Sequence, residues 1–234
     1  SYSGFNSLQV ACERAPALKA ICAIYATDDR YTDDVHMYGG CRRAVDTVDY
    51  VAYMTAMNAL PPVPAVFGDG WRDEWRRRVE QTPSWVPNWF AQQTDGSYWR
   101  HGSLRPDYSR ITAATMLVGG WADGYRNAPL RSVEAMDCPV EVLLGPWSHA
   151  PAEVGLPGPG IDLVPELIAW FDRWLRPAAG TDPVSTFRPG HRIFMRRPTP
   201  PSAVLGEHHG SFRLVRHPEP QAWWRLDGPA DRIT

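Results

Sequence analysis

Three residues in this sequence have the types and the order of a nucleophile, acid and base: Ser1, Asp123 and His149. A serine hydroxyl is a weak nucleophile, so it needs a base within hydrogen-bond reach and a third group that holds the base in the right tautomer. Asp123 and His149 each follow an apolar run, at 111–119 and 138–144 respectively. Because such groups act from loops after the carboxyl ends of parallel strands, we predict acyl transfer with Ser1 as nucleophile, Asp123 as orienting acid and His149 as base.

The first four residues, Ser1-Tyr2-Ser3-Gly4, match the end of a G-x-S-x-G nucleophile elbow, with Ser3 in the place of the last glycine. The order serine, aspartate, histidine along the chain is the order that the α/β-hydrolase fold uses. Since the chain begins with serine rather than methionine, we expect a fragment of a larger hydrolase whose N-terminal strands lie upstream.

The elements that must position these residues alternate between helix and strand. The patterns predict helices over 5–14, 129–136 and 161–176 and buried strands over 17–26, 111–119 and 138–144. This alternation predicts a parallel sheet with right-handed crossovers. Gly119 and Gly120 are expected to be turn glycines.

A second group of elements interrupts this core. Helical spacing recurs over 48–60, 69–81 and 84–92, and the last two segments place tryptophans on one face, which is typical of a packed helical cap. Beyond Pro177 the chain contains proline, glycine and short β-prone runs at 191–195, 211–215 and 222–226. We therefore expect four segments: the first part of the core at 1–46, the cap at 47–110, the second part of the core at 111–180, and the start of a C-terminal, jelly-roll-like β domain at 181–234.

Composition excludes several classes of protein. With 44% hydrophobic residues, 21% charged residues and a net charge of -2, the chain is predicted to be globular, with no nucleic-acid partner. No apolar run reaches the roughly 18 residues of a membrane-spanning helix. The four cysteines have no metal-ligand spacing and are expected to be free thiols, so we predict no metal and no cofactor. The acidic residues Asp28, Asp29, Asp33 and Asp34 are expected to lie in a solvated loop.

Six segments also carry a resemblance to a known family. They are residues 1–5, 18–21, 98–100, 118–125, 144–149 and 170–176. The two most specific are G-W-x-D at 120–123 and G-P-W-S-H at 145–149. In these segments the chain resembles the cocaine-esterase-like (CocE/NonD) serine hydrolases, which are related to X-Pro dipeptidyl-peptidases and α-amino-acid ester hydrolases.

The resemblance implies roles for particular residues. It implies Ser1 as catalytic serine, Asp123 as its acid and His149 as its base, with a helical cap between nucleophile and acid. It also implies that the backbone N–H of Tyr2 is one oxyanion donor, the other being a tyrosine hydroxyl in an upstream segment. Next to these residues, we expect the substrate pocket to be lined by Trp121, Tyr125 and Trp147.

The expected substrate is a small-molecule ester or amide. The α-amino-acid ester hydrolases carry acidic residues shortly after the catalytic aspartate, whereas this chain has Gly124, Tyr125 and Arg126 there. We therefore expect an acyl ester without a free α-amine, and an aromatic acyl group suits the tryptophan-rich cap. Neither the oligomeric state nor the compartment follows from the sequence, although the cytoplasm is slightly favoured.

Three alternatives stay open. The first is an X-Pro dipeptidyl-peptidase-like peptidase, and the second is an inactive fragment or scaffold of a larger hydrolase. The third is an N-terminal nucleophile hydrolase, in which the α-amine of Ser1 acts as the base. That third class leaves the loop at 145–149 unexplained, because it does not need His149.

Overall fold

The structure is a computed structural model that describes residues 1–105 and 107–216. It divides into two compact units. Unit 1 contains Ser1–Asp28 and the chain from Ser103 onward, and unit 2 contains Asp29–Gly102. The boundaries expected from the sequence, at 46, 110 and 180, stay predictions.

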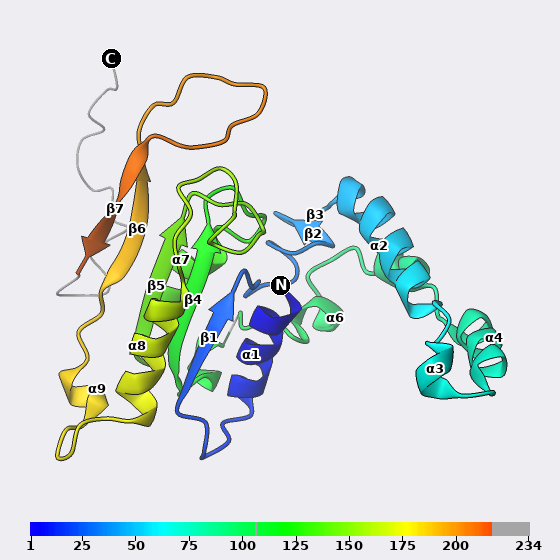
Figure 1. The fold of residues 1–234 in the computed structure, drawn as a ribbon, viewed down its shortest axis with the longest axis horizontal. Coiled ribbons are helices and arrows are strands. Elements are labelled where there is room, and N and C mark those ends of the chain that lie inside the picture. The colour runs from blue at the N-terminus through cyan, green and yellow to red at the C-terminus, as the bar shows by residue number, and fades with distance from the viewer. Residues whose placement is uncertain (106, 217–234) are drawn as a thin grey trace. The chain divides into compact units, whose positions relative to one another are not determined.

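Unit 1 is built around one mostly parallel sheet (Figure 1). Its elements are α1 (Tyr2–Cys12), β1 (Ala20–Ile24), η1 (Tyr108–Arg110), β4 (Ala114–Gly120), α7 (Ala128–Ala135), β5 (Val140–Gly145), α8 (Val164–Leu175), α9 (Pro183–Thr186), β6 (His191–Arg196) and β7 (Gly210–Val215). The strand order is β1-β4-β5-β6-β7, in which neighbours pair in parallel except for the antiparallel pair of β6 and β7. The predicted parallel α/β sheet is confirmed.

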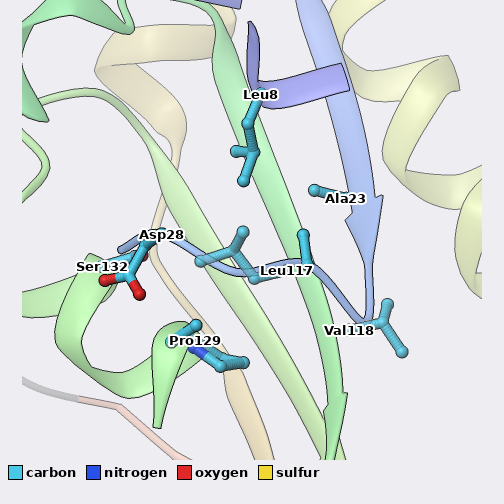
Figure 2. Close-up of a pocket in the computed structure, with 9 residues that line it drawn as sticks. Leu8, Ala23, Asp28, Leu117, Val118, Pro129 and Ser132 are labelled. Atoms are coloured by element: carbon cyan, nitrogen blue, oxygen red, sulfur yellow. The ribbon is translucent and has the colours of Figure 1, made fainter. Parts of the chain in front are cut away.

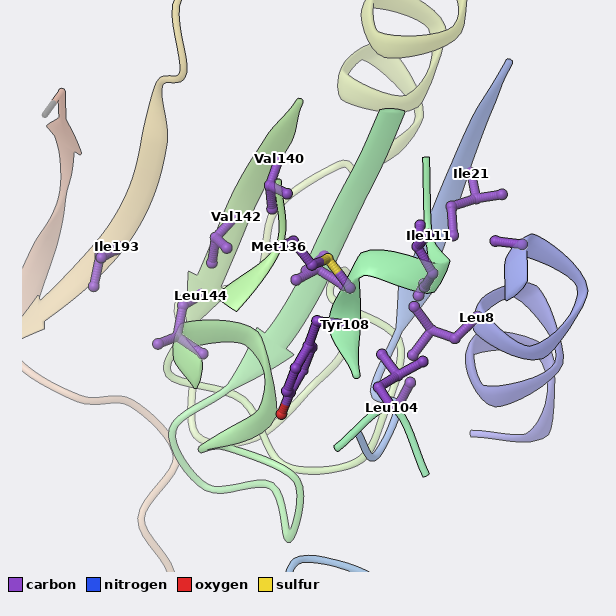
Figure 3. Close-up of a cluster of buried hydrophobic side chains, with 14 residues drawn as sticks. Leu8, Ile21, Leu104, Tyr108, Ile111, Met136, Val140, Val142, Leu144 and Ile193 are labelled. Carbon is purple, nitrogen blue, oxygen red and sulfur yellow. The ribbon is translucent and has the colours of Figure 1, made fainter. Parts of the chain in front are cut away.

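Two apolar clusters cover the two faces of this sheet. The first contains Leu8 of α1 together with alternate residues of the strands, such as Val142 and Leu144 (Figure 3). The second contains Leu143 and the two α8 tryptophans, Trp170 and Trp174. Successive strand residues face opposite sides, so a strand buried on both faces must be apolar throughout. This is why β4 and β5 form near-continuous apolar runs in the sequence.

The end of β4 differs from the sequence-based expectation, and the downstream strands of unit 1 belong to the same sheet. Gly119 and Gly120 are not turn glycines, since both are buried residues of β4 that pair with Leu144 and Gly145 of β5. The strand therefore continues one residue further than the sequence pattern indicates. Downstream, β6 pairs with β5 and extends the same sheet. The separate β domain over 181–234 stays a prediction, because residues 217–234, including the run 222–226, lie outside the described residues.

Unit 2 consists of short helices and one small hairpin. Its elements are β2 (Met37–Tyr38), β3 (Cys41–Arg42), α2 (Ala44–Asn58), α3 (Pro64–Phe67), α4 (Trp71–Gln81), α5 (Trp85–Ala91) and α6 (Ser97–Arg100). The helices expected at 48–60, 69–81 and 84–92 are confirmed as α2, α4 and α5 within a few residues at each end. The tryptophans predicted to form a stripe do pair, with the rings of Trp71 and Trp75 stacked 6.2 Å apart.

Candidate active site

The loops that follow β4 and β5 are joined by backbone hydrogen bonds. The Trp121 N–H donates to the Gly145 carbonyl at 2.9 Å, and the Ala122 N–H donates to the Trp147 carbonyl at 3.0 Å. Gly120 allows this approach, because a Cβ added there would lie 2.1 Å from the Trp147 carbonyl oxygen. Neighbouring parallel strands end side by side, so their loops are held at one edge of the sheet.

This edge brings Asp123 and His149 together. The His149 Nδ1 lies 3.0 Å from the Asp123 Oδ1, in hydrogen-bond contact. The Asp123 side chain is only 2% exposed, whereas the His149 side chain is 46% exposed. A carboxylate that accepts from Nδ1–H fixes the tautomer in which Nε2 carries the lone pair. The pair therefore has the geometry of an orienting acid and an accessible base.

Ser1 lies at the same edge of the sheet. It is the N-cap residue of α1, and its backbone nitrogen donates to the carbonyl of Tyr25, the residue after β1. The Ser1 and Ser3 hydroxyl oxygens are 2.9 Å apart. Gly4 lets α1 pack directly on the end of β1, because a Cβ there would lie 2.2 Å from the Ile24 carbonyl oxygen. In Figure 1 the N-terminus accordingly lies near the arrowhead of β1.

Two tyrosine rings flank the His149 imidazole. The Tyr25 ring centroid is 5.3 Å away at an interplanar angle of 49°, and the Tyr125 ring is 5.4 Å away at 76°. Both distances are typical of aromatic pairs in contact. Tyr125 is one of the residues expected to line the pocket. Tyr25 was missed, since nothing in the sequence around the end of β1 distinguishes it from other core positions.

Two further expected site residues are Tyr2 and Trp121. Tyr2 is the first residue of α1, and it is 59% exposed. N–H groups in the first turn of a helix point out of its N-terminus, which is the direction that an oxyanion donor needs. The Trp121 indole N–H donates to the Phe194 carbonyl at 2.7 Å, so this side chain points towards β6.

Trp147 does not lie where a substrate could touch it. It is fully buried, and its indole N–H donates to the Pro159 carbonyl at 2.8 Å. Gly145 and Gly155 pack directly on it, with added Cβ atoms 2.4 Å and 2.8 Å from its side chain. The expectation that Trp147 lines the pocket is therefore corrected: its ring fills the second apolar cluster and supports the loop that carries His149.

The acidic run is buried, so the prediction of a solvated loop is wrong. In unit 1, Asp28 is 1% exposed and accepts hydrogen bonds from Arg131 Nε at 2.8 Å, from Arg131 Nη2, and from the Tyr108 hydroxyl at 2.5 Å. Charge-assisted hydrogen bonds compensate for the lost hydration of a buried carboxylate. The partner Arg131 lies far away in sequence, which is why local composition does not reveal this pair.

In unit 2, Asp29, Asp33 and Asp34 are also buried. Asp29 accepts from the Tyr31 N–H at 3.0 Å and from the Thr32 hydroxyl at 2.8 Å. Asp34 lies 2.9 Å from the His36 Nδ1. These short-range contacts stabilise the start of unit 2 rather than offering free carboxylates to a substrate.

A small cavity in unit 1 is not lined by any of these catalytic candidates (Figure 2). It is lined by residues of α1, β1, β4 and α7, among them Leu8, Leu117 and Pro129, with Asp28 and Ser132 as its polar groups. Its volume of about 10 Å³ is the space of roughly one water molecule. The cavity is therefore a packing defect of the core rather than a substrate pocket.

The described residues contain neither a metal-binding cluster nor a membrane-spanning helix. Within 1–105 and 107–216, no group of histidine, cysteine, aspartate and glutamate side chains could hold a metal ion. Over the same residues, no helix has the length and apolar character needed to cross a membrane. The four cysteines are free thiols, as predicted.

Comparisons with known proteins give a consistent result. The sequence profile described as X-Pro dipeptidyl-peptidase (S15 family) matches residues 1–151. No protein with a curated description matches the chain significantly. Two solved structures of a CocE/NonD family hydrolase from Staphylococcus aureus match 92% of this chain, with TM-scores of 0.52 and 0.56 and sequence identities of 13% and 14%.

These structural matches cover only 32% and 33% of the solved chains, so this chain spans about a third of their length. At such low identity the likeness shows the fold alone, which is that of the α/β-hydrolases. The profile match covers more than half of this chain and includes Ser1, Asp123 and His149. The resemblance to CocE/NonD hydrolases is thereby confirmed, and the chain belongs to the X-Pro dipeptidyl-peptidase (S15) family of hydrolases.

Proposed function

We propose that the protein containing this chain is a serine hydrolase that cleaves acyl esters through an acyl-enzyme intermediate. The main observation is the contact between the buried Asp123 carboxylate and the half-exposed His149 imidazole, at the sheet edge where Ser1 also lies. Residues suited to act as nucleophile, base and orienting acid are thus supplied by three different segments of one unit, which supports the proposal. Because the chain spans about a third of the solved hydrolases, the activity is proposed for the whole protein.

In the proposed reaction, His149 Nε2 removes the proton from the Ser1 hydroxyl as the oxygen attacks the ester carbonyl. The buried Asp123 charge stabilises the imidazolium that forms. The Tyr2 backbone N–H donates to the oxyanion of the tetrahedral intermediate. Its collapse gives acyl-Ser1 and an alcohol, which receives the proton from His149. Water then repeats the sequence and releases the carboxylic acid.

Residues after Asp123 support an ester over a substrate with a free α-amine. Gly124, Tyr125 and Arg126 offer no carboxylate that could pair with an ammonium group. The profile match to X-Pro dipeptidyl-peptidases favours peptide cleavage as the second candidate. Parallel assays with p-nitrophenyl butyrate and glycyl-prolyl-p-nitroanilide separate the two, since we expect the higher kcat/KM for the ester. A higher value for the anilide would favour the peptidase.

The nucleophile is tested by treating the full-length protein with a fluorophosphonate and mapping the adduct by mass spectrometry. We expect the label on Ser1, and none after Ser1→Ala. Ser3→Ala is the matched control, because its hydroxyl lies 2.9 Å from that of Ser1. A label on Ser3 or Ser148 would contradict the assignment. A full-length protein with neither labelling nor hydrolysis would instead favour an inactive scaffold.

A further inference from the structure

Tyr25 contacts two members of the proposed triad and lies within electrostatic reach of the third. Its carbonyl accepts a hydrogen bond from the Ser1 backbone nitrogen. Its ring lies against the His149 imidazole, with centroids 5.3 Å apart. The charge of Asp123 acts on its hydroxyl. One side chain and its own backbone thus reach the nucleophile, the base and the acid.

The backbone of Tyr25 is held in an unusual conformation. Its φ is +50°, in the left-handed region that favours glycine. Its N–H still donates to the Val118 carbonyl at 2.8 Å, so the chain leaves the sheet immediately after this bond. A tyrosine in this region is strained, and such strain persists where the surrounding contacts over-determine it. Here those contacts are with Ser1 and His149.

The hydroxyl of Tyr25 is buried within the electrostatic influence of Asp123. Tyr25 is 5% exposed and Asp123 is 2% exposed, and within the described residues neither the tyrosine hydroxyl nor Asp123 Oδ2 has a hydrogen-bond partner. Burial, together with the charges of Asp123 and Glu153, raises the pKa of Tyr25, so the hydroxyl keeps its proton. A buried donor thus lies in the field of a buried carboxylate oxygen, and each lacks a partner.

We propose that Tyr25 is a positioning residue for the triad. Its ring keeps the His149 imidazole in the orientation that meets Asp123, and its hydroxyl stabilises the Asp123 charge from the side that His149 does not cover. This inference rests on the proposed function, because it concerns how that triad is held. It also gives a reason for a strained tyrosine at the end of β1.

Tyr108 provides a matched control for Tyr25. It is also a buried tyrosine of unit 1, and its hydroxyl donates to a buried carboxylate, that of Asp28, at 2.5 Å. Arg131 pairs with the same carboxylate. Loss of the Tyr108 hydroxyl therefore removes a buried hydrogen bond without touching Ser1, Asp123 or His149.

The experiment compares Tyr25→Phe, Tyr25→Leu and Tyr108→Phe in the full-length protein, with p-nitrophenyl butyrate as substrate. We expect Tyr25→Phe to lower kcat about tenfold and leave KM unchanged, because only the buried donor is lost. Without this donor more of the Asp123 charge acts on protonated His149, so the acid limb of the pH profile moves to higher pH. Tyr25→Leu should lower kcat by about a hundredfold, since the ring is lost as well.

Tyr108→Phe should lower the Tm but leave kcat and the acid limb at wild-type values. Wild-type kcat and an unmoved acid limb in Tyr25→Phe would overturn the proposal. A loss of activity in Tyr25→Phe that follows its Tm, with the acid limb in place, would also overturn it and assign a purely structural role. Fluorophosphonate labelling of Ser1 in the wild type distinguishes failure of the Tyr25 proposal from failure of the proposed function. Absence of this label would reject the proposed function itself. If Tyr25→Leu does not fold, Tyr25→Phe alone decides.

Discussion

The two units differ in how far they bury their apolar residues. Both buried apolar clusters belong to unit 1, and every residue of β4 is buried. In unit 2, by contrast, α3, α4 and α5 contain no buried residue, and large side chains such as Val66 and Phe67 are exposed. Unit 1 therefore has the packed interior that can hold a catalytic geometry, whereas α4 and α5 of unit 2 carry mainly local contacts.

Those local contacts are short in sequence. Glu74 pairs with Arg77 and Arg78 within one turn of α4, and these arginines lower the pKa of Glu74 to about 2. Within α5, the rings of Trp85 and Trp89 also pair. Such pairs support helices but bury little surface. The comparison predicts that substitutions in unit 1 strongly lower the catalytic rate or the free energy of unfolding. Substitutions in unit 2 should change both only weakly.

The largest expected effect is on rate. If the sheet of unit 1 holds the site independently, Asp123→Asn should lower kcat by about 10⁴-fold while the fold is retained, because the wrong His149 tautomer is then favoured. Ester hydrolysis and the Tm are measured together, with Asp172→Asn on the surface of α8 as the control. More than about a tenth of wild-type activity in Asp123→Asn would reject its assignment as the acid.

The next effect is on stability. Arg131→Ala leaves the buried Asp28 without its cation, which is expected to lower the free energy of unfolding by about 3–5 kcal/mol. Denaturant unfolding measures this loss. Arg77→Ala in unit 2 is the control, since it removes an exposed pair and should have little effect. Equal losses in the two variants would break the contrast between the units.

Core packing gives a third test. Leu144 of β5 is completely buried, so Leu144→Ala should cost about 2–5 kcal/mol of unfolding free energy. Val66→Ala in α3, where the side chain is 86% exposed, should stay within about 0.5 kcal/mol. A Val66→Ala cost close to that of Leu144→Ala would mean that unit 2 buries this residue in the whole protein.

The smallest effect concerns thiol reactivity. Burial raises the pKa values of Cys12, Cys22 and Cys138 in unit 1, that of Cys22 to about 12, whereas Cys41 in unit 2 is exposed. The thiolate is the reactive form, so iodoacetamide at pH 8 should modify Cys41 first, as mass spectrometry would show. Modification of Cys22 before Cys41 would contradict the comparison.

The raised pKa values of the buried thiols also predict the direction in which stability changes with pH. A raised pKa means that the folded state holds its protons more tightly, so this contribution is fully present below the ordinary thiol pKa of about 8.5. It is lost as the pH rises towards about 12, the pKa of folded Cys22. Thermal unfolding between these pH values should therefore show a falling Tm.

Much of the candidate site could be proposed from the sequence because its signals are local. Asp123 and His149 each follow an apolar run, and a buried parallel strand must be apolar on both faces. By contrast, nothing near Tyr25 marks it as a neighbour of His149, since the contact spans two strands. Asp28 is a similar case: its acidic neighbours suggested a solvated loop, but its partner Arg131 lies over a hundred positions away.

The sequence by itself determined the alternation of strands and helices and the order of serine, acid and base, because periodicity, turn residues and chain order are all properties of neighbouring residues. Only the tertiary structure decided which side chains meet. It buried Trp147 in the core, paired Asp28 with Arg131 and placed Tyr25 against His149. Those outcomes depend on the order in which strands join the sheet, and distant strands become neighbours only when the whole chain has folded.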